Sequence, residues 1–140
     1  MSQSDDASMV TCMRTALESS GLRAGDIGYV NAHATGTTQG DAAEVRAIQA
    51  VFGAGVPVSS LKGNLGHTLG SSGAIELAAT VEMMNAGVIY PTHNLAEVAA
   101  DCVGIGHVRA KTAHRFSTFL KNSFAFGGIN AAIVCGQPRA

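Results

Sequence analysis

The chain has 140 residues, of which 46% are hydrophobic and 14% are charged. This length and balance are typical of one α/β domain with a hydrophobic core, and they exclude a largely disordered chain. The nine Lys and Arg residues are scattered and the formal net charge is −1, which argues against a nucleic-acid-binding surface.

The first predicted element is an amphipathic helix near the N-terminus. Apolar side chains recur at the spacing i, i+3, i+4, i+7 and i+8, at Met9, Cys12, Met13, Ala16 and Leu17. We expect this helix to begin at Asp5 or Asp6, to stop at Gly21 and to have Cys12 on its buried face. Residues 26–31 (DIGYVN) then predict a short buried strand that leads into a glycine-containing turn.

Two more helices and a strand are predicted in the middle of the chain. Residues 41–52 predict the first of these helices, with Asp41 near its N-terminus and Gly53 after its end. Its core-facing side chains are expected to be Ala43, Val45, Ile48, Val51 and Phe52. Residues 56–61 predict a second strand, and an alanine-rich helix follows from residue 71 or 72 to residue 85.

The last part of the chain predicts the closing strands of a sheet. Residues 91–97 are irregular, and residues 104–109 predict a strand. Residues 116–123 and 131–135 predict two strands that the glycine turn FAFGGIN joins into an antiparallel pair. Strands that alternate with helices predict a layered α/β domain, a mixed sheet with packed helices, whose three glycine-rich loops meet at one end of the strands.

Two histidines in glycine-rich loops are the candidate site. His33 lies in NAHATGT, and His67 lies in LKGNLGHTLGSSG. Two neutral imidazoles that face one pocket can donate two hydrogen bonds to a developing oxyanion or enolate. Lys62 would disfavour protonation of both rings, and Glu76 in the following helix would hold Lys62. The alternatives are two structural or surface histidines and a glutamate that faces water.

Phe124 and Phe126 lie two residues apart in the turn FAFGGIN. In an extended segment this spacing puts both rings on one face, so one of them could gate a pocket. The alternative is that both are core aromatics and that Gly127 and Gly128 form only a turn.

Metal, thiol and phosphate chemistry are disfavoured. The five histidines, His33, His67, His93, His107 and His114, lack the spacing of metal ligands. Cys12, Cys102 and Cys135 are too widely spaced for a disulfide framework, and Cys12 and Cys135 are expected to be small core residues rather than activated thiols. In the loop around His67, Lys62 precedes the glycines, unlike the lysine of a phosphate-binding loop.

The sequence predicts a cytoplasmic protein without a membrane segment. The N-terminus, MSQSDDAS, is polar and acidic rather than signal-like. No apolar run approaches the roughly 20 residues that a membrane helix needs. Three reduced cysteines also suit the cytosol.

At these motifs the sequence resembles the C-terminal half of the β-ketoacyl-acyl-carrier-protein synthases, the thiolase-like condensing enzymes of fatty acid and polyketide synthesis. The likeness covers residues 5–135 and rests on three ordered motifs, YVNAHATGTTQGDAAE, SSLKGNLGHTLGSSGAIE and KNSFAFGGINAAIV. The chain departs from the family at four positions. The family usually has Gly where this chain has Ala34 and Ala125, a small polar residue where it has Gly63, and Thr where it has Ile129.

The resemblance implies a role for each matching residue. His33 and His67 would be the catalytic histidines that decarboxylate a malonyl thioester and stabilise the enolate, with Lys62 as the organising lysine and Glu76 as its partner. Phe126 would be the gate of the acyl pocket. Asn122, Phe124, Gly127 and Gly128 would shape that pocket and the oxyanion hole. The resemblance implies no cofactor.

The resemblance also implies that residues 1–140 are a single C-terminal domain. The family's acyl-carrying cysteine belongs to an N-terminal half, and no motif of this chain matches it, so we expect the isolated chain to be inactive in condensation. The expected partners are an acyl carrier protein with its acyl and malonyl thioesters, the N-terminal half, and a second copy of the chain.

Two alternatives to a condensing enzyme remain. One is a non-catalytic partner subunit of the chain-length type, which the retained histidines and lysine argue against. The other is a structural or carrier-docking module, for which the basic residues form only a loose cluster at Arg109, Lys111, His114 and Arg115.

Overall fold

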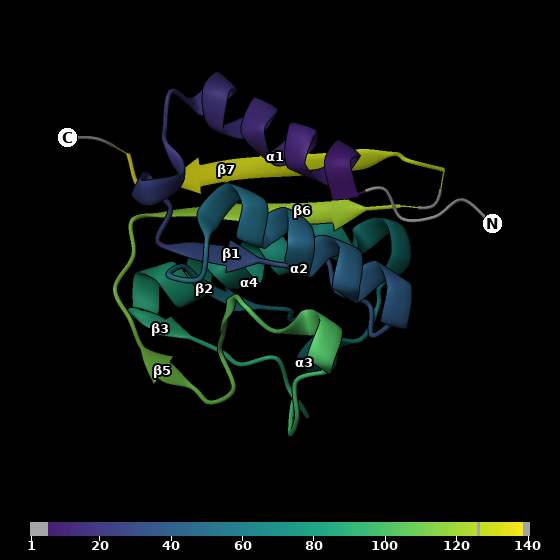
Figure 1. Ribbon diagram of the computed structural model, residues 1–140. Coiled ribbons are helices and arrows are strands. Elements are labelled where there is room, and N and C mark those ends of the chain that lie inside the picture. The colour runs from purple at the N-terminus through teal and green to yellow at the C-terminus, as the bar shows by residue number, and fades with distance from the viewer. Residues whose placement is uncertain (1–5, 126, 139–140) are drawn as a thin grey trace.

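A computed structural model describes residues 6–125 and 127–138 (Figure 1). Its helices are α1 (Asp6–Ser20), α2 (Thr38–Phe52), α3 (Lys62–Leu65) and α4 (Ser72–Ala86), with short 3-10 turns at Ala24–Asp26, Leu69–Ser71 and Ala100–Cys102. Its strands are β1 (Tyr29–Asn31), β2 (Pro57–Ser59), β3 (Val88–Ile89), β4 (Gly106–His107), β5 (Thr112–Ala113), β6 (Thr118–Phe124) and β7 (Asn130–Gly136).

The main sheet has five strands in the order β4-β2-β1-β6-β7. Strands β4, β2, β1 and β6 are parallel, and β7 pairs antiparallel with β6 at one edge. Helices α1 and α2 cover one face of this sheet and α4 lies on the other (Figure 1). The predicted layered α/β architecture, with a mixed sheet and packed helices, is confirmed.

Side-chain alternation along β6 divides the core in two. Leu120 and Phe124 point to the face covered by α1 and α2, where they join one cluster of buried apolar residues. Phe119 points to the opposite face and packs in a second cluster with Met83 and Met84 of α4. Every residue of β6 from 119 to 122 is buried, so any polar side chain in this strand needs a partner.

Most predicted elements are present with shifted ends. Helix α2 begins at Thr38 rather than residue 41, because the Thr37 carbonyl accepts the Asp41 N–H at 2.9 Å and so opens the first helical turn. The predicted strand at 26–31 shortens to β1 because residues 24–26 form a 3-10 turn. The predicted strand at 104–109 is only β4. The antiparallel pair at the sheet edge is confirmed.

Two cysteines are less buried than predicted. In α1 the fully buried stripe is Met9, Met13 and Leu17, at a spacing of four, and Cys12 lies beside it at intermediate exposure. Cys12 lines an open groove between α1 and β7. Cys135 is also only partly buried, because it lies on the edge strand β7.

In α2, Val51 and Phe52 are only partly buried, whereas Glu44 is 2% exposed. The helix therefore turns a carboxylate, not only apolar side chains, toward the sheet.

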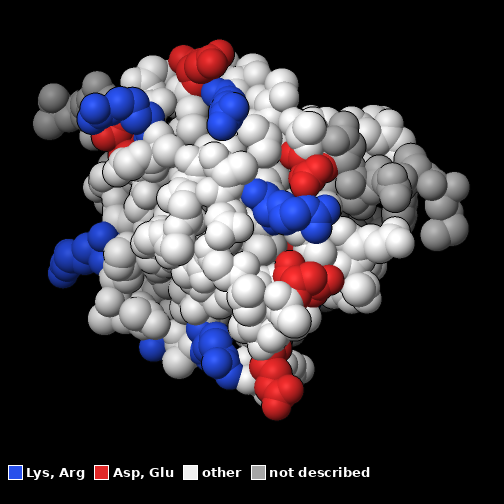
Figure 2. All heavy atoms as spheres, viewed as in Figure 1, with Lys and Arg blue, Asp and Glu red and all other residues white. Residues whose placement is uncertain are grey.

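Acidic and basic side chains are dispersed over the face shown in Figure 2, without a large patch of either sign. No helix in the described residues is both long and apolar enough to cross a membrane.

Candidate active site

The loops that follow β1 and β2 meet at the carboxyl ends of the parallel strands, where β6 also ends. The parallel register places Asn31 of β1 opposite Ser59 of β2 on one side and Lys121 of β6 on the other. His33 follows β1 by two residues and Lys62 follows β2 by three. The expectation that these loops converge is met. Phe126 of the third loop, the predicted gate, lies outside the described residues.

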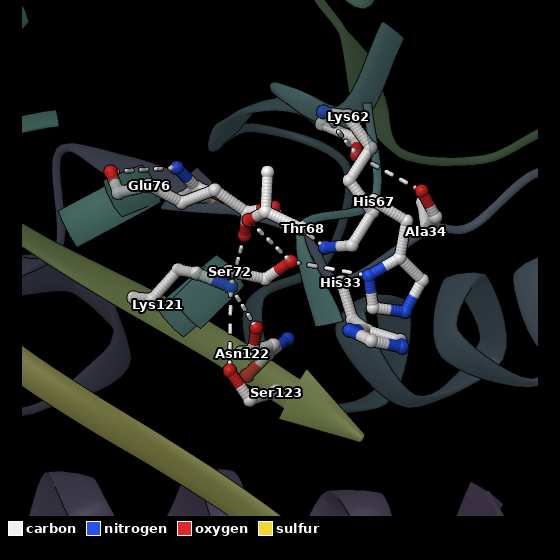
Figure 3. A network of polar contacts seen from close by, with 12 residues as sticks. His33, Ala34, Lys62, His67, Thr68, Ser72, Glu76, Lys121, Asn122 and Ser123 are labelled. Atoms are coloured by element: carbon white, nitrogen blue, oxygen red, sulfur yellow. Dashed lines mark hydrogen bonds and ion pairs between the residues drawn. The ribbon is translucent and has the colours of Figure 1, made fainter. Parts of the chain in front are cut away.

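His33 and His67 lie side by side at these strand ends (Figure 3). Their ring centroids are 5.8 Å apart, and the ring planes are nearly perpendicular at 87°. His33 is half-buried, whereas His67 is exposed. Two histidines that are 34 positions apart in the sequence are thus close enough to bind one small group.

The hydrogen bonds of His67 assign its tautomer. The backbone N–H of Leu69 donates to Nδ1 of His67 at 3.1 Å, so this nitrogen carries no hydrogen. The Ser72 hydroxyl lies 3.1 Å from the same nitrogen and donates to it. A neutral imidazole that accepts at Nδ1 carries its hydrogen on Nε2. His67 therefore offers an N–H donor at Nε2.

His33 is neutral at pH 7 for electrostatic reasons. Burial, followed by the positive charges of Lys62 and Lys121, lowers its pKa to about 4. Within the described part of the chain, neither ring nitrogen of His33 has a hydrogen-bond partner. A neutral imidazole has one donor and one acceptor, and both remain free for a ligand.

Glu44 fixes the backbone of the His33 loop. Its two carboxylate oxygens accept the backbone N–H groups of His33 and Ala34 at 2.8 and 2.7 Å. The Asn122 amide donates to the same carboxylate at 3.1 Å. Burial raises the pKa of Glu44, and these three donors oppose that shift. Sequence reasoning missed Glu44, although a glutamate flanked by buried Ala43 and Val45 was a usable signal.

Lys62, Glu76 and Lys121 form a buried ionic cluster. Lys62 Nζ lies 2.8 Å from one oxygen of the Glu76 carboxylate, and Lys121 Nζ lies 2.7 Å from the other. The three side chains are 6%, 2% and 1% exposed, in the order Lys62, Glu76, Lys121. The ion pair expected between Lys62 and Glu76 is present. Lys121 was not singled out from the sequence, although a lysine directly after the apolar pair Phe119 and Leu120 of a predicted strand is unusual.

Phe124, Gly127 and Gly128 surround the end of β6. Phe124 is buried in the core cluster under α1 and α2, and its ring centroid lies 6.2 Å from that of His33. Gly127 and Gly128 have φ angles of 84° and 77°, a left-handed conformation that favours glycine. They close the turn in which the Ala125 N–H donates to the Ile129 carbonyl at 2.9 Å.

The thiols of the chain are not activated. Burial raises the pKa of Cys12, Cys102 and Cys135, which disfavours the nucleophilic thiolate. Among the described residues, no three His, Cys, Asp or Glu side chains are grouped so that they could hold a metal ion.

Comparisons with known proteins identify the family. A sequence profile described as "Beta-ketoacyl synthase, C-terminal domain" matches residues 1–96. The chain belongs to this family. The barley (Hordeum vulgare) 3-oxoacyl-[acyl-carrier-protein] synthase I, chloroplastic, is 36% identical over 138 residues, which cover 94% of this chain and 29% of the barley protein. The chain thus spans less than a third of that relative.

Solved ketosynthases confirm the expected thiolase-like fold. The β-ketoacyl synthase of Burkholderia phymatum superposes with a TM-score of 0.94 and 42% identity, over 99% of this chain and 34% of that protein. A ketosynthase solved with its type II polyketide synthase acyl-carrier protein superposes with a TM-score of 0.89 and 29% identity, over 98% of this chain and 35% of its own.

Proposed function

We propose that this chain supplies the two-histidine part of a β-ketoacyl-acyl-carrier-protein synthase. The reaction would be the decarboxylative condensation of an acyl thioester with a malonyl thioester on a carrier protein. The observation that carries the proposal is the adjacent pair His33 and His67, whose ring centroids are 5.8 Å apart. One ring is neutral at pH 7, and the other has its Nδ1 occupied as an acceptor.

Such a pair suits a reaction in which negative charge develops on one oxygen. When the bond between the malonyl carboxylate and its neighbouring carbon breaks, carbon dioxide leaves and the electron pair forms an enolate on the thioester. His67 Nε2–H and an N–H of His33 would donate to that enolate oxygen. This charge is absent from the ground state, so the donors stabilise the transition state selectively. The enolate carbon then attacks the acyl thioester, and the cysteine thiolate leaves.

Other residues of the site would act by positioning these donors. Lys62, held by Glu76, adds positive potential beside His33. Asn122 acts through Glu44, whose carboxylate holds the His33 loop. Phe124 packs on His33. We propose that Phe126 gates the acyl pocket and that Gly127 and Gly128 shape its loop.

The acyl-carrying cysteine would come from the N-terminal half of the synthase. The pKa values of the chain's own thiols are all raised, so none suits the nucleophilic step. Near His67, the side chains of Leu65, Leu69 and Ile75 are 45%, 77% and 41% exposed. This apolar surface supports a covering partner there. An acyl carrier protein and a second copy of the chain are the other proposed partners.

A chimaera tests the proposal. The matching segment of the Burkholderia phymatum synthase would be replaced by this chain, since the two folds superpose closely. We expect the chimaera to release carbon dioxide from malonyl-carrier protein and to form the β-ketoacyl product. His67→Ala should abolish both activities.

The matched control is His114→Ala. His114 lies at the opposite, amino-terminal end of β1, where its Nε2 contacts the Gly28 carbonyl at 3.1 Å, so this variant should keep its activity. Full activity in the His67→Ala chimaera would overturn the assigned role. A folded chimaera that binds carrier protein without releasing carbon dioxide would favour a non-catalytic partner subunit.

A further inference from the structure

A second buried lysine lies in the site, and the proposed reaction leaves it without a role. Lys121 belongs to β6, and its side chain is 1% exposed. In Figure 3 it lies next to Asn122 and Ser123 on the strand that runs beneath the histidines. A lysine is almost never fully buried unless its charge is paired.

The ammonium of Lys121 has three polar partners. One is the Glu76 carboxylate oxygen at 2.7 Å, one is the Asn122 carbonyl, and one is the Ser123 hydroxyl at 3.4 Å. Burial lowers the pKa of Lys121, and the interaction with Glu76 opposes this shift. The ion pair with Glu76 and the two hydrogen bonds favour the charged form.

The cluster holds more positive charge than its stability requires. Lys62 and Glu76 alone would be a neutral buried pair, and a second buried ammonium adds a desolvation cost. With Lys121 the three side chains carry a net charge of +1. Glu44 of α2 is the other charged side chain that contacts a residue of β6. It lies on the opposite face of the sheet, where its carboxylate accepts the backbone N–H groups of His33 and Ala34.

We propose that Lys121 is a positioning residue of the two-histidine site. Its ammonium forms an ion pair with the second carboxylate oxygen of Glu76. Together with Lys62 it gives the cluster an excess positive charge, which favours an anionic intermediate at His33 and His67. This inference rests on the function proposed above. It states that the excess positive charge of the cluster contributes to the reaction, and not only the ion pair between Lys62 and Glu76.

The first test measures how the charge of Lys121 affects the pKa of His33 in the full chain. The pKa of His33 would be followed by NMR in the unaltered chain and in Lys121→Met, which keeps the length of the side chain without its charge. The groups that face the ring are Lys62, Lys121, His67 and Glu76. Removal of one nearby ammonium should raise the pKa of His33 by roughly one unit.

The control for this test is Arg14→Met, which removes one positive charge from the exposed face of α1 and should leave the pKa of His33 unchanged. A rise of less than about 0.2 unit in Lys121→Met would overturn the inference, because it would be too small for a neighbouring buried charge.

A second pair of variants separates charge from packing. Glu76→Gln with Lys121→Met restores a cluster charge of +1, carried by Lys62 alone, and should return the pKa of His33 toward its original value. If Lys121→Met does not fold, the same inference is tested by comparing this double variant with Glu76→Gln. The double variant should then have the higher pKa at His33, and equal values would contradict the inference.

The catalytic readout uses the chimaera. Lys121→Met should lower kcat about tenfold while KM changes less than about twofold, because the excess charge acts on the intermediate and not on substrate binding. An unchanged kcat would overturn the inference. A chimaera without any activity would count against the proposed function instead, and the NMR result would still decide the charge effect.

Discussion

Replacing Glu76 with glutamine should destabilise the fold strongly. The carboxylate of Glu76 is 2% exposed and is the shared counter-charge of Lys62 and Lys121, at 2.8 and 2.7 Å. Glu76→Gln keeps the shape of the side chain but leaves two ammonium groups close together without a negative partner. Loss of one member of a buried ion pair costs about 3–5 kcal/mol, so the free energy of unfolding should fall by at least that range.

The loss should depend on pH in a defined direction. In the variant, burial without a counter-charge lowers the folded-state pKa of Lys121 further below its usual value. The unfolded chain then binds more protons than the folded chain between the two pKa values. Stability therefore rises with pH in that window. The variant should recover part of its lost stability as pH is raised from 7 to values near that of a free lysine.

Urea denaturation of the full chain at neutral and alkaline pH measures both effects. The matched control is Glu82→Gln, which makes the same change on the exposed side of the same helix and should alter stability by less than about 0.5 kcal/mol. A loss in Glu76→Gln no larger than in this control, or a loss that does not shrink as pH rises, would refute the reasoning.

Three further outcomes are expected. The pKa of His33 is about 4 against an ordinary value of 6.5, so the contribution of His33 to stability is complete above pH 6.5 and is lost as pH falls toward 4. His33→Gln should therefore make the free energy of unfolding depend less on pH between 4 and 6.5 in denaturation experiments. An unchanged slope in this range would contradict the assignment. Glu44→Gln turns an amide N–H₂ toward the backbone donors of the His33 loop and should cost about 1–3 kcal/mol in the same assay; an effect as small as that of an exposed glutamate would argue against its role. Gly128→Ala, at φ 77°, should cost about 1–2 kcal/mol by thermal unfolding, whereas Gly70→Ala, where a Cβ meets nothing within 4 Å, should not; equal effects would show that the backbone conformation is not the cause.

Patterns of apolar residues predicted the long elements well and the short ones poorly. Helices α1, α2 and α4 each have 15 residues, so several turns of periodicity mark them. Helix α3 has four residues, and β3 and β5 have two each. Such elements contain less than two periods of any pattern, and tertiary contacts fix them instead.

The histidines and Lys62 could be predicted because glycine-rich loops mark them in the sequence. Glu44 and Lys121 could not be found that way, because each lies inside a helix or strand and not in a glycine-rich loop. Their function depends on which face of the element they occupy, and that depends on sheet pairing. The burial of Cys12 was predicted wrongly for a related reason: the width of the apolar stripe on α1 exceeds the width of the surface that β7 and α2 cover.

Side chains of β6 contact the helices on both faces of the sheet, so the register of this strand determines both sets of contacts. Consecutive residues, Lys121 and Asn122, point to opposite faces of the sheet and meet two different carboxylates, Glu76 of α4 and Glu44 of α2. A slip of β6 by one residue would turn the ammonium away from Glu76 and the amide away from Glu44, and both carboxylates would lose a partner. These two contacts therefore stabilise one register of β6 over a register shifted by one residue.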